Sequence, residues 1–178
     1  MTDKGQARDA MISQAALQLE AGAFEDAIEG FTACLLVSTD DPTAYRGRAM
    51  ARFQIKDWKG AEADFRKAQD IEPSEPENAL GVAMSLAMRH EIYPAIAEFE
   101  SLLKENPKFV RGQIQLGLLQ IKVGAITKGK EILNEALNHR PSLAERRMIE
   151  TALKEQADLD KNRYYRPDFE ALRKRKKE

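Results

Sequence analysis

The sequence has little of what covalent or metal chemistry needs. Its 178 residues include one cysteine, Cys34, and two histidines, His90 and His139. A single cysteine excludes an intramolecular disulfide and a cysteine cluster for a metal ion within this chain. We expect Cys34 to be a buried small side chain rather than a reactive thiol, because free cysteine is among the most buried residue types. Both histidines are expected at the surface, and no cofactor is predicted.

Long apolar runs and catalytic motifs are also missing. No apolar run approaches the roughly 18 residues that are needed to cross a bilayer, so no transmembrane segment is predicted. The polar start from Met1 to Arg8 lacks the pattern of a secretory leader, which favours a cytoplasmic protein. The sequence contains no glycine-rich phosphate loop, no nucleophile elbow and no paired-histidine motif. Its carboxylates are spread over the expected outer faces of helices, and the sequence therefore does not predict an enzyme.

What the sequence does contain is a repeat with a period of 34 residues. Small, aromatic and closing residues each return at this spacing. The alanine series is Ala27, Ala61 and Ala95, the phenylalanine series is Phe31, Phe65 and Phe99, and the proline series is Pro73, Pro107 and Pro141. A fixed period of this length is typical of stacked helical hairpins.

The stretch from Ala44 to Pro73 is the clearest copy of the repeat. It carries Tyr45, Ala49, Ala61, Phe65, Ala68 and Pro73. On these residues the chain resembles the tetratricopeptide repeat (TPR) family. The resemblance implies an all-α fold, a right-handed superhelical solenoid of antiparallel helix hairpins, in which small residues let the two helices of a hairpin cross closely.

Projecting the period along the chain divides it into units. We predict an N-terminal extension at 1–7, TPR units at 8–41, 42–75, 76–109 and 110–143, a capping helix at 144–157 and a basic tail at 158–178. Ser142 and Glu145 have the spacing of a capping box that begins the capping helix. In the fourth unit, Gly129 and Leu133 replace the alanine and the phenylalanine. Since a mid-helix glycine costs about 1 kcal/mol against alanine, we expect this unit to be the loosest.

Charge is distributed unevenly along the chain. Residues 161–178 contain eight basic and three acidic residues, a balance of +5, which leaves −6 on the rest of the chain. Body and tail are therefore expected to attract each other. The run from Arg173 to Lys177 could touch nucleic-acid phosphates or an anionic membrane surface, but without interleaved aromatic residues a solvated tail is the preferred interpretation and nucleic acid is an unlikely partner.

The resemblance also implies where a partner binds. In TPR proteins the first helix of each hairpin lines a concave groove. Carried onto this sequence, the groove positions are Ile12, Ala16, Arg46, Met50, Leu80, Met84, Met88, Arg111, Ile114 and Leu118. Most are apolar, and we expect Met50, Met84, Leu80, Ile114 and Leu118 to be exposed there, whereas Leu19, Phe53 and Ile121 are expected in the core. The polar residues of a clamp for a peptide carboxylate are absent, since Ile12 and Ala16 stand where two of them are needed.

These features predict a noncatalytic adaptor or assembly factor. It would bind an apolar peptide or helix of another protein, with Arg46 and Arg111 orienting an acidic flank of that ligand. Two alternatives remain open. In the first, the module self-associates and its groove is filled by the tail of the same or another copy, through Tyr164, Tyr165, Phe169 and Leu172. In the second, the tail binds nucleic acid or a membrane surface.

Overall fold

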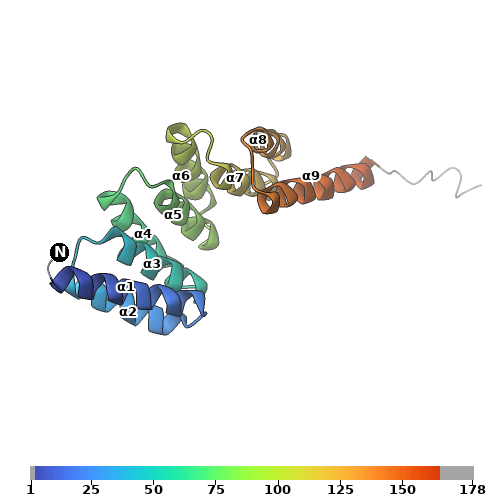
Figure 1. Cartoon of the computed structure of the whole chain (residues 1–178). Helices are drawn as coiled ribbons and strands as arrows, with labels where there is room; N and C mark the ends of the chain where they lie inside the picture. The colour runs from blue at the N-terminus through green and yellow to red at the C-terminus, as the bar shows by residue number, and fades with distance from the viewer. Residues whose placement is uncertain (1–2, 165–178) are drawn as a thin grey trace, which may run out of the picture.

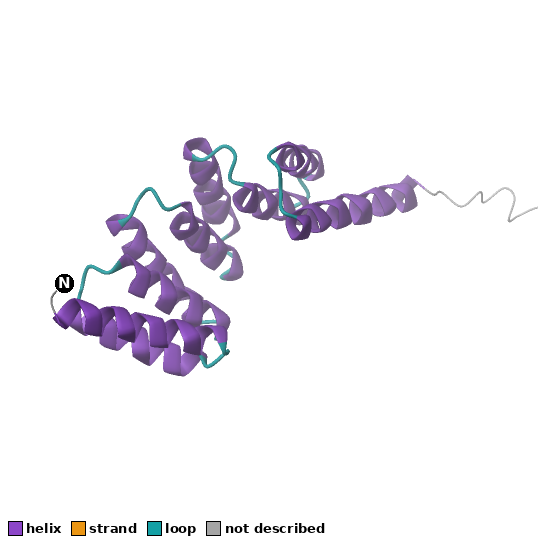
Figure 2. Ribbon diagram, viewed as in Figure 1, coloured by secondary structure: helices purple, strands orange, loops and turns teal. Residues whose placement is uncertain are grey.

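Helices account for all the regular structure in the part of the chain that is described. The computed structural model describes residues 3–164, and this range holds nine α-helices and no strand (Figures 1 and 2). Their bounds are α1 Asp3–Glu20, α2 Phe24–Val37, α3 Pro42–Gln54, α4 Trp58–Ile71, α5 Pro76–Met88, α6 Ile92–Glu105, α7 Val110–Lys122, α8 Ile126–Asn138 and α9 Leu143–Tyr164. The all-α class is confirmed.

The first eight helices form four hairpins that stack side by side. In Figure 1 the hairpins α1–α2, α3–α4, α5–α6 and α7–α8 follow one another along a curved solenoid, and α9 packs on the last of them. The predicted superhelical solenoid of antiparallel hairpins is therefore confirmed. None of the helices in residues 3–164 is both long and apolar enough to cross a membrane. Within the same residues, no group of three His, Cys, Asp or Glu side chains could hold a metal ion.

The two ends of the solenoid differ from the expected boundaries. α1 begins at Asp3, so most of the predicted N-terminal extension is helical, which suits the helix-forming Gln6, Ala7 and Arg8. α9 continues to Tyr164, seven residues past the predicted end of the capping helix. It is held there because Asp160 accepts hydrogen bonds from Lys130 of α8 and from Gln156. Residues 165–178 lie outside the described residues, and the predictions that involve their side chains stay predictions.

The turn inside each hairpin has the same backbone geometry. Gly22, Lys56, His90 and Gly124 follow one another at 34 residues, and each has a positive φ, of 78°, 66°, 65° and 90°. A left-handed residue at this point ends the first helix and reverses the chain. Glycine adopts that conformation freely, whereas lysine and histidine do so at a cost in free energy.

Small residues set the crossing of the two helices in every hairpin. The facing pairs are Ala15 and Ala27, Ala49 and Ala61, Ala83 and Ala95, and Gly117 and Gly129. All six alanines are 0% exposed. In the fourth hairpin the two backbones approach closely, since a Cβ atom at Gly129 would lie 2.6 Å from the carbonyl oxygen of Gly117. The expectation that this unit is the loosest stays a prediction, and the glycine leaves room for α7 and α8 to cross.

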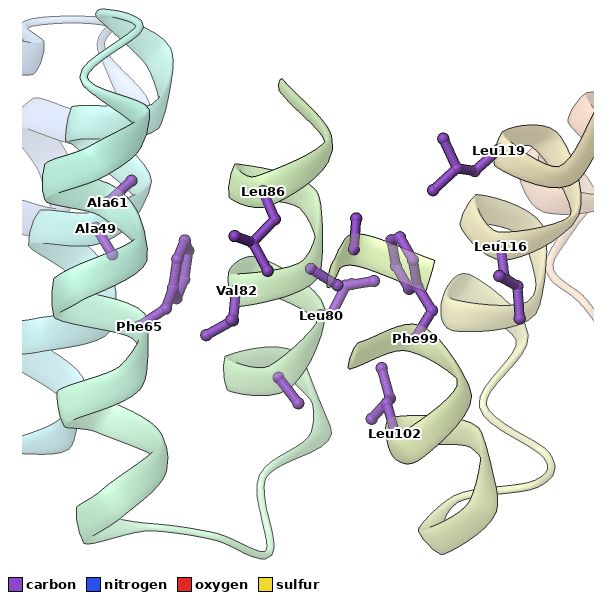
Figure 3. Close-up of a cluster of buried hydrophobic side chains, with 13 residues drawn as sticks. Ala49, Ala61, Phe65, Leu80, Val82, Leu86, Phe99, Leu102, Leu116 and Leu119 are labelled. Carbon is purple, nitrogen blue, oxygen red and sulfur yellow. The ribbon is translucent and has the colours of Figure 1, made fainter. Parts of the chain in front are cut away.

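Phenylalanine rings join one hairpin to the next. The ring of Phe31 covers Gly47 of α3, and that of Phe65 covers Gly81 of α5, where a Cβ atom would lie 2.5 Å from the ring (Figure 3). At the next interface Phe99 is also buried, but Gln115 occupies the position of the glycine. The stacking of the fourth hairpin on the third is thus built differently from the two before it.

The buried apolar residues form three clusters along the solenoid. The first joins α1, α2 and α3 and includes Cys34, the second joins α3 to α7, and the third joins α7, α8 and α9. Cys34 is 0% exposed, as expected, and burial together with nearby Asp41 raises the pKa of its thiol. Figure 3 shows the second cluster, in which Phe65, Leu86 and Phe99 are among the large side chains.

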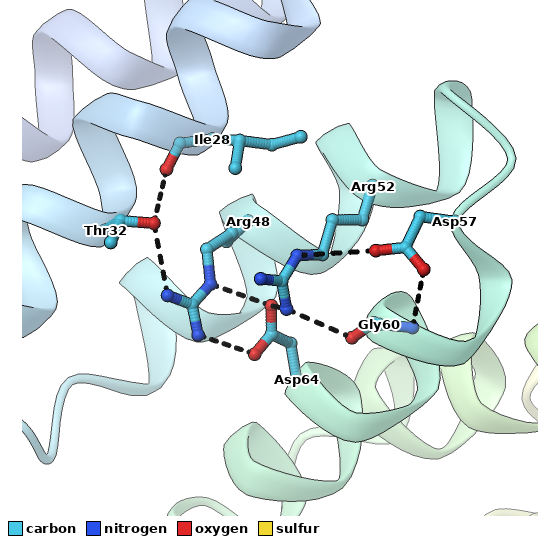
Figure 4. A network of polar contacts seen from close by, with 7 residues as sticks. All are labelled: Ile28, Thr32, Arg48, Arg52, Asp57, Gly60 and Asp64. Carbon is cyan, nitrogen blue, oxygen red and sulfur yellow. Dashed lines mark hydrogen bonds and ion pairs between the residues drawn. The ribbon is translucent and has the colours of Figure 1, made fainter.

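A polar network lies where the first and second clusters meet. Arg48 of α3 donates two hydrogen bonds to Asp64 of α4, of 2.8 and 2.7 Å, and a third of 3.2 Å to Thr32 of α2 (Figure 4). Arg52 donates to the same carboxylate at 2.7 Å. Asp64 is 3% exposed, and its hydrogen bonds raise the pKa of Arg48. The two ion pairs join α3 to α4 within the second hairpin, and the bond from Arg48 to Thr32 adds a polar contact to the apolar ones between the first and second hairpins.

Candidate peptide-binding groove

One repeat position forms an apolar row along the first helices of the hairpins. Ala16, Met50, Met84, Leu118 and Ala152 follow at intervals of 34 residues, on α1, α3, α5, α7 and α9. Of these, Met50 is 48% exposed, and the other four are partly buried. The superhelix thus repeats one contact point on alternate helices, because the same face of each first helix returns at each step of the solenoid.

Three cavities lie between successive members of this row. The first, of about 410 Å³, lies between α3 and α5 and is lined by Met50, Phe53, Leu80 and Met84 among others. The second, of about 180 Å³, lies between α5 and α7 and shares Met84 with the first. The third, of about 390 Å³, lies between α7 and α9 and shares Leu118 with the second. We call this row of three cavities, linked by the shared side chains of Met84 and Leu118, the A-helix groove.

Most of the predicted groove residues border these cavities. The first cavity brings together Arg46, Met50, Leu80, Met84 and Arg111, and the second adds Met88 and Leu118. Three predicted residues, Ile12, Ala16 and Ile114, line none of the three cavities. Ile12 and Ala16 instead pack against the cluster of the first hairpin.

Two side chains are less accessible than expected. Leu80 is 3% exposed and Ile114 is 2% exposed, so the expectation that both are open to the groove is wrong. Both stand one helical turn before the apolar row, at the fifth repeat position, where the side chain points between neighbouring helices. Leu80 still forms part of the floor of the first cavity, whereas Ile114 belongs to the core shared by α7, α8 and α9.

The charges along the groove fall into two groups. At the first cavity, Arg46 pairs with Glu72 at 3.3 Å and Arg111 pairs with Glu77, so both arginines already have a carboxylate partner. At the second cavity Lys122 has no ion pair within residues 3–164, and at the third neither has Arg147. Glu155 lines the third cavity with Arg147 and has no ion pair in that range either, so the excess positive charge lies at Lys122 beside the second cavity.

Sequence reasoning missed part of this surface. Phe53, expected in the core, lines the first cavity, and Thr151, Ala152 and Glu155 of α9 line the third. Extending the 34-residue period from Leu118 into the capping helix would have found Ala152. The signal was present, but a capping helix is expected to close a solenoid rather than to extend its groove.

Comparisons with known proteins give one kind of match. No family model matches the chain, and no curated protein matches it. A solved structure of Pseudomonas aeruginosa pilF aligns with a TM-score of 0.73 at 18% identity, covering 88% of this chain and 72% of that one. A thermophilic TPR protein of Thermus thermophilus also gives 0.73 at 18%, covering 82% and 81%.

A third similar structure holds a peptide. It is the first TPR of Spaghetti (RPAP3) bound to an HSP90 peptide, and it aligns with a TM-score of 0.62 at 18% identity, over 67% of this chain and 97% of that one. Identities at this level show the fold. The 34-residue period, the repeated small-residue crossings and these alignments together show that the chain has the tetratricopeptide repeat fold.

Proposed function

We propose that this protein is a noncatalytic adaptor that holds an apolar segment of another protein in the A-helix groove. The observation that carries the proposal is the apolar row beside three successive cavities, in which Met84 is shared by the first and second and Leu118 by the second and third. An amphipathic helix or an extended apolar peptide would place its large side chains in successive cavities. Methionine is flexible and polarizable, so it adapts to ligand side chains of different shape.

The charges beside the groove bear on the direction of the ligand. Arg46 and Arg111 are neutralised within the protein, whereas Lys122 and Arg147 have no ion pair in residues 3–164. Because Glu155 lines the third cavity together with Arg147, an acidic flank of the ligand would lie beside Lys122 at the end of α7. This differs from the orientation expected from Arg46 and Arg111 alone. The peptide in the RPAP3 structure supports peptide binding as a use of this fold.

The test is a selection of ligands followed by affinity measurements. A library of random displayed peptides would be selected on the whole chain, and the best peptide titrated by fluorescence anisotropy. Met84→Arg places a charge between the first and second cavities and should weaken binding at least about tenfold, or about 1.4 kcal/mol. Met50→Arg, at a side chain that is 48% exposed, tests the same groove with less risk to folding.

The control is Tyr93→Arg on α6, since Tyr93 is 86% exposed and lines none of the three cavities. It should leave the affinity unchanged, and circular dichroism should show equal helix content in all variants. Selected peptides that bind both groove variants as tightly as the original chain would contradict the proposal. So would a selection that yields no peptide.

A further inference from the structure

The face of the first hairpin that points away from α3 carries a groove of its own. This end groove, of about 570 Å³, lies between α1 and α2. Met11, Ala15, Gly30 and Ala33 contribute its apolar floor, and Asp26 and Glu29 stand at its edge. It is separate from the A-helix groove, with which it shares no residue.

The equivalent face of the later hairpins is covered. Gln18 and Gly30, which line the end groove, occupy the repeat positions of Arg52 and Asp64. In the second hairpin this face meets the first hairpin, since Arg48 donates a hydrogen bond to Thr32 of α2. In the third hairpin the same face packs on the second, within the cluster that includes Phe65 and Leu86. On the first hairpin no element of residues 3–164 takes the place of a preceding helix. Its shape therefore suits a segment of chain laid along α1 and α2.

The charge of the molecule is polarised from one end to the other. Residues 1–41 contain eight acidic and two basic residues, a balance of −6, whereas residues 42–160 contain eighteen of each and are neutral. The final residues, 161–178, carry the balance of +5. Neither Asp26 nor Glu29 has an ion pair within the described range. The negative excess thus lies in the first 41 residues, which include the hairpin that bears the end groove.

We propose that the end groove binds the basic C-terminal segment, residues 165–178, of a second copy of this chain. Tyr165, Phe169 and Leu172 supply apolar side chains for the floor, and the run from Arg173 to Lys177 supplies charges for the acidic edge. Opposite potentials guide such partners together and fix their orientation. The proposal concerns a different surface from the A-helix groove and holds whether or not that groove binds a peptide.

The geometry favours a second copy over the same molecule. α9 lies at the opposite end of the solenoid from α1 and α2 and runs away from them (Figure 1). The C-terminal end of α9 therefore lies far from the end groove. The fourteen residues 165–178 span at most about 50 Å when fully extended. To reach the end groove of their own molecule they would first have to return along α9, which is itself about 33 Å long. An interface that joins one end of a copy to the other end of the next is heterologous, and it builds open chains unless it closes into a ring.

Two full-length variants test the proposal, each lacking one half of the interface. Asp26→Lys with Glu29→Lys reverses the edge of the end groove. Changing Arg173, Lys174, Arg175, Lys176 and Lys177 to glutamine neutralises the tail. A matched control, Glu131→Lys with Glu135→Lys, makes the same change of charge at exposed positions of α8. Mass in solution would be measured by sedimentation equilibrium, with helix content checked for each variant.

The unmodified chain should associate at about 50 mM salt, and its dissociation constant should rise at least about tenfold at about 500 mM. Each half-deficient variant alone should be monomeric, and the control should associate like the original. Mixed together, the two half-deficient variants should form a one-to-one complex that grows no further, since only one complete interface remains. Met84→Arg should leave self-association unchanged.

Several results would overturn the proposal. They are a monomeric original chain at low salt, self-association of either half-deficient variant, and a mixture of the two that stays monomeric. The last result is also the outcome expected if the tail binds its own molecule or a different protein. Loss of self-association in Met84→Arg would place the tail of the second copy in the A-helix groove instead. Failure of peptide selection, by contrast, would affect only the adaptor function.

Discussion

The second and third hairpins have the same backbone, yet the space between each of them and the preceding hairpin is filled by different chemistry. On the side of the second hairpin that faces the first, Arg48, Arg52 and Asp64 form a largely buried network. On the side of the third hairpin that faces the second, Val82 and Leu86 occupy the repeat positions of the two arginines and belong to the largest apolar cluster. Both hairpins nevertheless keep the alanine crossing, the left-handed turn and the ring that covers a glycine.

The difference separates what the repeat requires from what it tolerates. The constant features control how closely helix backbones approach and where the chain reverses. The variable positions only fill a volume, and either paired charges or apolar side chains can do so. A buried ion pair contributes little net stability compared with well-packed apolar residues, but removing one partner is costly because the other charge stays buried. The two hairpins should therefore respond differently to equivalent substitutions.

The largest effect is expected for Asp64→Asn. Its side chain is 5% exposed and is shared by Arg48 and Arg52, which are 15% and 26% exposed, so the substitution leaves Arg48 without a counter-charge and Arg52 with only the longer contact to Asp57 at 3.8 Å. We expect a loss of about 3 kcal/mol in the free energy of unfolding, measured by urea denaturation.

The matched control for Asp64→Asn is Glu98→Gln. Glu98 occupies the same repeat position in the third hairpin, but its side chain is 26% exposed and pairs at 2.9 Å with Arg66, which is 45% exposed. A pair this accessible to solvent should contribute no more than about 0.5 kcal/mol. Equal losses for the two substitutions would mean that burial does not distinguish the hairpins.

The next effect concerns the crossing of helices, which the fourth hairpin makes with glycine where the second and third use alanine. Gly129→Ala would place a methyl group 2.6 Å from the carbonyl oxygen of Gly117 and 2.7 Å from Cγ1 of Ile121. Helix propensity alone predicts a gain of about 1 kcal/mol. Because the backbones must separate, we expect instead a loss of about 2 kcal/mol in the same denaturation experiment. A more stable variant would show that α7 and α8 move apart without cost.

A smaller effect is expected when the polar network is replaced as a whole. Arg48→Leu, Arg52→Leu and Asp64→Ile together introduce residues that the third and fourth hairpins have at equivalent positions, namely those of Leu116, Leu86 and Ile132. No buried unpaired charge remains, since Asp57, which loses Arg52, is 47% exposed, so the triple variant should be within about 1 kcal/mol of the original chain or more stable. A loss as large as that of Asp64→Asn would instead assign a net stabilising role to the network.

Much of the fold could be predicted from the sequence, because close helix crossings need small residues at fixed spacing. The period of the alanines and phenylalanines located the hairpins and most of the residues around the first cavity. Local reasoning failed where the decisive partner is distant in sequence. The role of Gly129 in the crossing was missed because its cost in a helix is local, whereas Gly117 faces it from the preceding helix. The length of α9 was missed because Asp160 is bound by Lys130 of α8.

The smallest expected effect lies in the turns, where the second and third hairpins resemble each other and differ from the first and fourth. Lys56 and His90 adopt φ values of 66° and 65°, at the position where the other hairpins have Gly22 and Gly124. A left-handed residue other than glycine costs roughly 1–2 kcal/mol, and the added freedom of glycine in the unfolded chain offsets about half of that. His90→Gly and Lys56→Gly should therefore each raise the free energy of unfolding by about 0.5–1 kcal/mol. His90→Ala, which keeps the strain, should give no gain, and since the turns are far apart the two glycine gains should add. Equal behaviour of the alanine and glycine variants would show that the histidine side chain, and not its backbone conformation, sets the stability of the turn.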